Sequence, residues 1–342
     1  MRHQKKRWFA ALLSLCMLLS ILPSTSLAFS ESEETWSGNR RNQTIDGGTH
    51  TITLSNLTID SPGVEKSAID ITGNADVTFI LEGNNTLRGY RNHPAIWVES
   101  GSSVTFEGNG LLEASAGGAS IGLGAAGIGG GYGASSNFGN ITINGGTIIA
   151  RGSGGGAGIG GGYEVGSGTV TGNVTINGGY VTAIGGSSGS TGGAGIGSGE
   201  NANYSGTVTI NGGVVYAEGG ADSTSIGSGN RAIGTSDNGA FTTGTGGNAV
   251  IVAPDGIGDP SGFADWDGIF ISFEGNNTSA TVGEDGTVHL NDTEANIQVW
   301  GEPVIDYPLV VESGTELRVV QNDRNYAYAT LEIGQDGKLT NN

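Results

Sequence analysis

Residues 140–150 read Asn-Ile-Thr-Ile-Asn-Gly-Gly-Thr-Ile-Ile-Ala, and the same unit returns with small changes at 173–183 and 207–217. The asparagines before the Gly-Gly pairs, at positions 144, 177 and 211, are 33 and 34 residues apart. A second element lies between these units and reads Ala-Gly-Ile-Gly-Gly-Gly-Tyr at 126–132 and 157–163. Self-similarity at such a period is typical of repeat architectures, in which each unit packs only against its neighbours.

A weaker form of the repeat begins earlier in the chain. Val-Thr-Phe occurs at 77–79 and 104–106, so that Phe79 and Phe106 are 27 residues apart, and β-like strings return after residue 248. We therefore divide the chain into a signal peptide at 1–28, an N-terminal linker or cap at 29–44, glycine-rich repeats at 45–232, a Gly/Thr-rich connection at 233–248 and C-terminal coils at 249–342.

Each repeat offers three strands that are too short to form an independent sheet. Stacked on equivalent strands of the next copy, they satisfy their backbone hydrogen bonds. No 3.6-residue apolar period follows residue 28, so crossover helices are not expected. The sequence predicts an all-β fold, a right-handed parallel β-helix (β-solenoid) with about one coil per 27–37 residues, the hand following the general preference of parallel crossovers.

Side-chain alternation along each strand assigns the two faces. The predicted inward residues are Ile141, Ile143, Ile148 and Ala150, with their equivalents in the next two copies: Val174, Ile176, Val181, Ala183, Val208, Ile210, Val215 and Ala217. The outward face carries Thr142, Thr175 and Thr209. Asn144, Asn177 and Asn211 fall where the chain must bend. Asparagine tolerates the left-handed conformation that such a corner needs, and the two glycines behind it adopt it at no steric cost. We expect the stacked asparagines to form a side-chain ladder.

The first 28 residues have the order of a secretory signal peptide, with basic residues, an apolar run and Ser-Leu-Ala at 26–28. Their removal takes four of the 14 Lys and Arg residues and no acid, which leaves 10 minus 33, a net charge of −23. We therefore expect a secreted or cell-surface protein with no nucleic-acid partner and no membrane insertion after cleavage. Cys16 lies in the removed segment, so disulfides are not expected.

The alternation of Ala-Gly-Ile-Gly-Gly-Gly with Ile-Thr-Ile-Asn-Gly-Gly-Thr resembles the glycine-rich repeats of large Gram-positive surface proteins, described as pectate-lyase-like β-helix or carbohydrate-binding-domain proteins. The likeness covers most of residues 45–342. It implies a bacterial cell-surface or cell-wall location and a monomer that binds a polysaccharide or a host glycan as an adhesin-like module. Folds of this kind host lyases, adhesins and passive stalks alike.

Catalysis has little support in the residues, so we predict that the protein is not an enzyme. A pectate-type polysaccharide lyase, the alternative, needs a basic side chain to remove a proton and a cation to stabilise the developing charge. Only Arg151 lies within the strongest repeats, where Ile184 and Glu218 replace it in the other copies. A passive structural stalk is a further alternative.

A cluster of carboxylates gives the one candidate metal site. Asp255, Asp259, Asp265 and Asp267 lie in a loop with prolines and glycines, and oxygen ligands so spaced suit Ca²⁺. The alternative is a solvated loop. No other cofactor is expected.

Tyrosines give the candidate sugar site, because sugars stack their apolar faces on aromatic rings. Tyr132 and Tyr163 occupy equivalent positions, and Tyr180 and Tyr216 are assigned to the outward face. Tyr204 and Trp97 are weaker additions to this candidate site. The alternative is that these rings merely cover the glycine-rich wall. Separately, the row of outward threonines is of the kind that organises water in ice-binding solenoids, but such a role needs a longer and more regular array than three copies.

Overall fold

The computed structural model describes residues 34–60, 65–118, 123–133, 136–166, 168–230 and 249–258, and the backbone of further strands between 238 and 341. The elements named in these ranges are all β-strands, and no α-helix is found among them. The fold is therefore all-β, as predicted.

The first row of strands is a seven-stranded parallel sheet. Its members are β2 (Gln43–Asp46), β4 (Ile69–Thr72), β7 (Ile96–Val98), β10 (Ile128–Gly129), β13 (Ile159–Gly160), β19 (Ile196–Gly197) and β22 (Ile226–Gly227). The Gly-Ile-Gly segments thus pair with one another, with Ile128 opposite Ile159 and Ile159 opposite Ile196.

The second and third rows belong to one larger sheet and share strand β3 (Thr49–Asp60), which pairs with β5 through residues 49–55 and with β6 through residues 58–60. The second row continues through β5 (Asp76–Glu82), β8 (Ser103–Gly108), β11 (Asn140–Ile143), β15 (Asn173–Ile176), β20 (Ala202–Ile210) and β23 (Asn238–Thr243). The third row continues through β6 (Asn84–Arg88), β9 (Leu111–Ser115), β12 (Thr147–Arg151), β16 (Tyr180–Ile184), β21 (Gly213–Glu218) and β24 (Ala249–Val252). A short strand, β14 (Gly168–Val170), pairs with the start of β20, and β17 (Ser187–Ser188) and β18 (Thr191–Gly192) form a separate hairpin.

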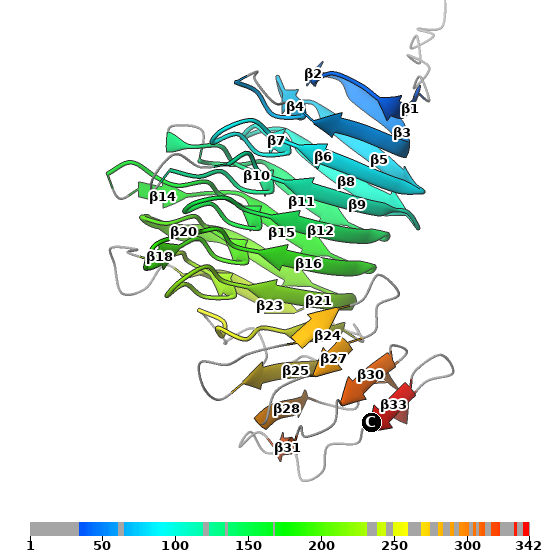
Figure 1. The fold of residues 1–342 in the computed structure, drawn as a ribbon, viewed down its shortest axis with the longest axis vertical. Helices are drawn as coiled ribbons and strands as arrows, with labels where there is room; N and C mark the ends of the chain where they lie inside the picture. The colour runs from blue at the N-terminus through cyan, green and yellow to red at the C-terminus, as the bar shows by residue number, and fades with distance from the viewer. Residues whose placement is uncertain are drawn as a thin grey trace, which may run out of the picture. The chain divides into compact units, whose positions relative to one another are not determined.

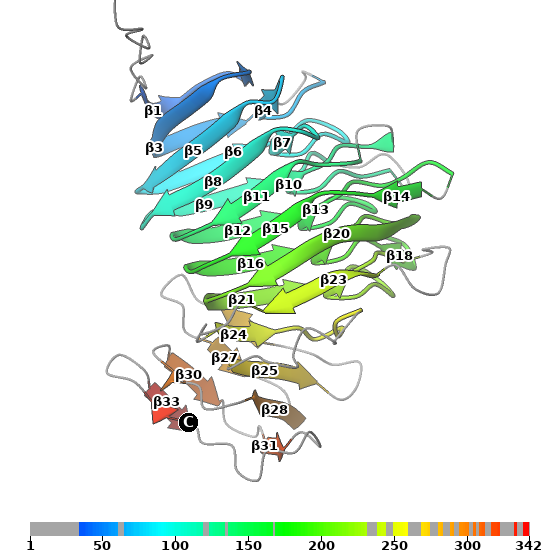
Figure 2. The same ribbon diagram turned by 180° about the vertical axis from the view of Figure 1, so that it is seen from behind.

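Each repeat adds one strand to each row, and neighbours within a row are parallel. In both views the third-row strands β6, β9, β12, β16 and β21 lie side by side in chain order (Figures 1 and 2). Ile143 is paired with Phe106 on one side and with Ile176 on the other, and Ile176 is paired with Ile210. The predicted alignment of the copies is confirmed.

The core lies on the inward side of these rows. The predicted inward residues of the three strongest copies are all buried, none with more than 1% of its surface exposed. Aromatic rings fill the core of the earlier coils, where the Phe79 and Phe106 centroids are 5.9 Å apart. Farther along, Phe138 and Tyr204 are stacked at 6.3 Å, and the Tyr204 hydroxyl donates a hydrogen bond of 2.8 Å to the carbonyl of Gly172.

The corners between the second and third rows contain the predicted ladder, and their left-handed turn lies at one of the glycines. The asparagine ladder is confirmed, since Asn177 Nδ2 donates to Asn144 Oδ1 at 2.8 Å and Asn211 Nδ2 donates to Asn177 Oδ1 at 2.7 Å. The asparagines themselves do not have positive φ. The left-handed turn is made instead by the second glycine behind each, with φ of 82° at Gly146 and Gly179, because glycine adopts it without steric cost.

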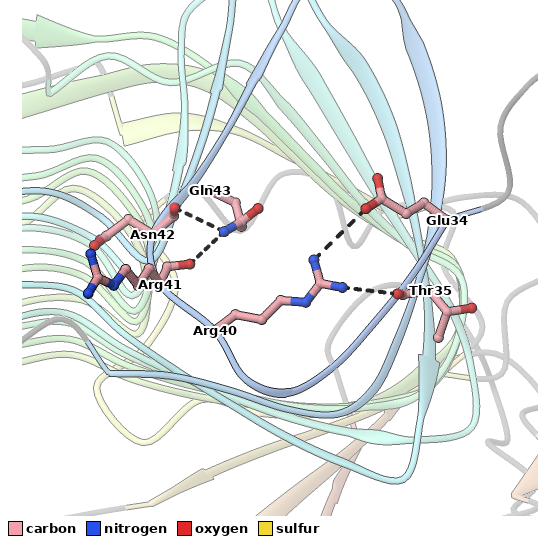
Figure 3. A network of polar contacts seen from close by, with 6 residues as sticks. All are labelled: Glu34, Thr35, Arg40, Arg41, Asn42 and Gln43. Carbon is pink, nitrogen blue, oxygen red and sulfur yellow. Dashed lines mark hydrogen bonds and ion pairs between the residues drawn. The ribbon is translucent and has the colours of Figure 1, made fainter.

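The stretch predicted as a linker or cap at 29–44 contains a strand. Strand β1 (Glu34–Asn39) pairs in parallel with β3, and Trp36 is buried at 4% exposure, 6.3 Å from the Phe79 ring. The Arg40 guanidinium lies 5.6 Å from the centre of the Trp36 ring. It also lies 3.9 Å from a Glu34 oxygen and donates a hydrogen bond to the Thr35 carbonyl at 3.3 Å (Figure 3). This stretch therefore includes a packed first strand.

The C-terminal part departs from the predicted parallel stacking. The stretch predicted as a connection at 233–248 contains β23, which pairs with β20, and β24 pairs in parallel with β25. Antiparallel pairs then appear, β25 with β28 and β26 with β27. These later strands are β25 (Gly268–Phe273), β26 (Ala280–Val282), β27 (Val288–Leu290), β28 (Glu294–Trp300), β29 (Val304–Ile305), β30 (Pro308–Val311), β31 (Glu316–Gln321), β32 (Glu332–Ile333) and β33 (Lys338–Asn341).

Candidate functional site

A cleft of about 390 Å³ opens on the outward side of the first row. Its lining comes from three stretches that are distant in sequence, and consists of Glu65, Arg91, Asn92, His93, Pro94, Trp97, Gly131 and Tyr132. The cleft thus combines two aromatic rings with side chains of both charges.

Trp97 reaches the cleft because of strand alternation. Its neighbours Ile96 and Val98 point into the core and are fully buried, so Trp97 points outward and is half-buried. In register with Trp97 on the next strand is Gly129, which has no side chain to cover the ring. The bare glycine leaves one side of the indole open to the cleft.

Tyr132 is stacked on Tyr163. The two ring centroids are 5.7 Å apart with an interplanar angle of 21°, and both residues follow the same Gly-Ile-Gly-Gly-Gly segment of consecutive repeats. The Tyr163 hydroxyl accepts a hydrogen bond of 2.9 Å from Asn201 Nδ2, which fixes the second ring. The two tyrosines predicted to be equivalent therefore extend the aromatic surface that begins at Trp97, and we refer to Trp97, Tyr132 and Tyr163 as the aromatic strip.

Two buried polar atoms lie at this cleft without a hydrogen-bond partner among the described residues, Trp97 Nε1 and Asn92 Oδ1. Asn92 is in the left-handed conformation, with φ of 52°. An unsatisfied buried polar atom is costly, and in native proteins such atoms gather where water or a ligand completes them.

Asp70 and His93 lie beside the cleft and interact electrostatically with each other. Asp70 is opposite Trp97 in the strand register and is only 8% exposed, so burial raises its pKa, while Ser67, Lys66 and His93 act in the opposite direction. Burial lowers the pKa of His93, against the pull of Asp70 and Glu65. His93 therefore favours its neutral form on the wall of the cleft.

The other two predicted tyrosines are not part of this cleft. Tyr180 lines a separate groove of about 220 Å³ with Thr147 and several glycines of the corner between the second and third rows. Tyr216 was expected on an exposed outward face, and that expectation is wrong, because the residue is only 6% exposed and its hydroxyl donates a 2.7 Å hydrogen bond to Glu218. Its outward neighbours Val214 and Val252 are fully buried, so this part of the third row is covered.

Of the four predicted calcium ligands, only Asp255 lies within the described residues; Asp259, Asp265 and Asp267 lie outside them. The Asp255 carboxylate accepts hydrogen bonds from the Gly219 amide at 2.9 Å and from the Ser225 hydroxyl at 3.4 Å. Burial of this carboxylate raises its pKa, and the nearby Glu218 raises it further. Over the described ranges, no three His, Cys, Asp or Glu side chains are grouped so as to hold a metal ion.

A second groove, of about 280 Å³, collects basic residues on the third row. Arg88 and Arg151 are both in register with Ser115, on the strands either side of it, and Glu113 shares the groove. In the sequence, Ile184 and Glu218 replace Arg151 in the other copies, and the register that brings Arg151 next to this groove is not visible from its sequence position.

Searches against protein-family models, curated proteins and solved structures find no match for this chain. In the described part of the chain, no helix has the length and apolar character needed to cross a membrane.

Proposed function

We propose that this is a secreted, cell-surface β-helix protein that binds carbohydrate without cleaving it, and that the aromatic strip is its sugar platform. The observation that carries this proposal is that Trp97 and Tyr132 line one open cleft and that Tyr163 is stacked on Tyr132. Sugar rings present apolar C–H faces that stack on aromatic rings, and the polar groups around the cleft suit their hydroxyls.

Successive repeats supply the length that a polymer needs. Trp97, Tyr132 and Tyr163 come from three consecutive repeats, and parallel neighbouring strands are about 4.8 Å apart. A chain of several sugar units lying along the stacking direction therefore meets one ring after another.

The fold that presents the strip is proposed to be a right-handed parallel β-helix with one coil per repeat. In support, each repeat gives one strand to each of three rows, neighbours within these rows are parallel in the glycine-rich part, and parallel crossovers are strongly biased to the right hand. Export is proposed from the signal-peptide pattern of the first 28 residues, which ends at Ala28.

A glycan array with residues 29–342 tests the function. We expect binding to at least one neutral or mixed polysaccharide, and Trp97→Ala or Tyr163→Ala should weaken it by roughly tenfold, because aromatic anchors dominate such interfaces. Tyr180→Ala is the matched control, since it removes a tyrosine from a groove outside the strip.

Two outcomes would contradict the proposal. Equal losses in Tyr180→Ala and Trp97→Ala would show that the strip is not the platform. Release of unsaturated sugar products by the purified protein would make it a lyase rather than a binding module.

A further inference from the structure

One column of threonines follows the strand register of the second row from β3 to β23, and its members from β3 to β20 lie on the outward side. The strand register places Thr51 opposite Thr78, Thr78 opposite Thr105, and Thr105 opposite Thr142. The same position continues through Thr175, Thr209 and Thr242. The sequence alone showed three copies, whereas the register shows seven, and four of these lie outside the three strongest repeats.

The column is regular. From β3 to β20 its pairing contains no bulge between Thr51 and Thr209, so each threonine lies one strand spacing, about 4.8 Å, from the next. Six threonines therefore span about 24 Å. Threonine is β-branched and has few χ1 choices, so its hydroxyl and methyl positions vary little along the column.

The hydroxyls of the column are available. Thr51, Thr78, Thr105, Thr142 and Thr175 are half-buried, and their side chains make no hydrogen bond within the described part of the chain. A half-buried hydroxyl without a protein partner on an open sheet face is hydrated. Each of these five groups thus holds water at a position fixed by the sheet.

The flanks of the column are fixed and uncharged in the strongest repeats. On one side Asn173 Nδ2 donates to Asn140 Oδ1 at 3.0 Å, and on the other the ladder of Asn144, Asn177 and Asn211 has bonds of 2.8 and 2.7 Å. Charges flank the column only in the earlier coils, at Asp76 and Glu107. An uncharged face is notable on a chain whose net charge is −19.

The spacing of the column agrees with that of ordered water. Two water molecules bonded to the same third molecule, at about 2.75 Å and a tetrahedral angle, lie about 4.5 Å apart. The strand spacing of about 4.8 Å differs from this by only about 0.3 Å. Waters held on successive threonines can therefore belong to one tetrahedral hydrogen-bonded network of the kind that forms the surface of ice.

We propose that the threonine column, with its asparagine flanks, binds the surface of ice crystals. This activity uses the second row, whereas the sugar platform uses the first, so the two do not depend on each other. The ligand class is crystalline water, held by hydroxyls at lattice spacing and by the methyl groups between them.

Partition of fluorescently labelled protein, residues 29–342, into slowly growing ice tests the proposal. We expect the unmodified protein to be incorporated and to inhibit ice recrystallisation. Thr142→Tyr combined with Thr175→Tyr should reduce both by several-fold, because the rings hold the ice lattice away from the column. Exclusion of the unmodified protein from ice would overturn the proposal.

Thr182→Tyr is the matched control, since Thr182 is an outward residue of the same repeat on the third row. The partition of the Thr182→Tyr variant into ice should be unchanged. A loss in Thr182→Tyr equal to that of the double variant would also overturn the proposal. If the tyrosine variants do not fold, as judged by circular dichroism, Thr142→Ala with Thr175→Ala removes the hydroxyls without added bulk and should still lower partition. Glycan binding measured on the same samples separates the two activities, because Trp97→Ala should leave ice partition intact.

Discussion

At the scale of single residues, the most informative group is Asp70, a carboxylate buried beside the cleft with one oxygen unpartnered among the described residues. Burial raises its pKa above the ordinary value of 3.8 despite Ser67, Lys66 and His93. The folded state therefore binds this proton more tightly than the unfolded state does. The resulting contribution to stability is present below the unfolded pKa and is lost as the pH rises through the folded one.

Replacing Asp70 with Asn should accordingly raise the melting temperature at pH 7, because the variant avoids an ionised carboxylate in a buried position. The gain should shrink as the pH is lowered through the raised folded pKa of Asp70, below which the carboxyl of the unmodified protein is protonated as well. Thermal unfolding followed by circular dichroism across this range measures the difference. A variant that is less stable than the parent at pH 7 would show that attraction to Lys66 outweighs burial.

The pKa of His93 is shifted in the opposite direction from that of Asp70. Burial lowers its pKa below 6.5, so its contribution to stability is present above the unfolded pKa and is lost as the pH falls through the lowered folded value. The variant His93→Gln should therefore flatten the decline of melting temperature just below pH 6.5. An unchanged decline in His93→Gln would assign that pH dependence to other groups.

At the scale of the strand, alternation predicted the inward residues correctly, and the asparagine ladder followed from stacking of identical corners. Other features depend on contacts between distant segments. Tyr216 alternates outward as predicted, yet neighbouring structure covers it.

The sequence did not predict the cleft, because the cleft is formed by the path of residues 91–94 around Trp97 and by the strand register that puts Gly129 beside Trp97. An outward tryptophan facing a glycine in the next repeat is the signal that could have found it.

The glycines of the first row give a prediction at the same scale. Gly129, Gly160 and Gly197 have φ between 126° and 138°, and a Cβ on Gly160 would lie 1.9 Å from the carbonyl oxygen of Gly197. Gly160→Ala must therefore push two strands apart, at a cost of roughly 2 kcal/mol or more. Chemical denaturation measures this loss.

Gly118→Ala is the control for that variant, because nothing lies within 4 Å of the added methyl and its φ is not in the left-handed region. It should change the free energy of unfolding by no more than about 0.5 kcal/mol. Similar losses in the two variants would mean that glycine content, rather than close approach of the first-row strands, determines stability.

At the scale of the whole molecule, stability is a sum of repeats and of the interfaces between neighbours. Deleting residues 144–176 removes one repeat and joins Ile143 to Asn177, which occupy consecutive positions of the same unit. The shortened protein should fold and unfold cooperatively at a somewhat lower temperature, because every remaining strand of the three rows keeps a parallel neighbour. Circular dichroism and size-exclusion chromatography check this.

Deleting only residues 144–159 should prevent folding, since it removes a third-row strand and leaves the following rows out of register. If both deletions fold equally well, or neither folds, the repeats are not the independent units that the pairing suggests.

The spacing of the rows has a consequence for how such a chain changes over time. Phe79 and Phe106 are 27 residues apart and Phe106 and Ile143 are 37 apart. Phe106 is nevertheless in register with Phe79 on one neighbouring strand and with Ile143 on the other. The additional length is absorbed where the chain leaves one row and enters another, as at residues 116–127 compared with 89–95. Insertions at these bends leave the lattice of strands undisturbed, so new recognition loops can be acquired at one edge of the protein while its flat faces are inherited intact.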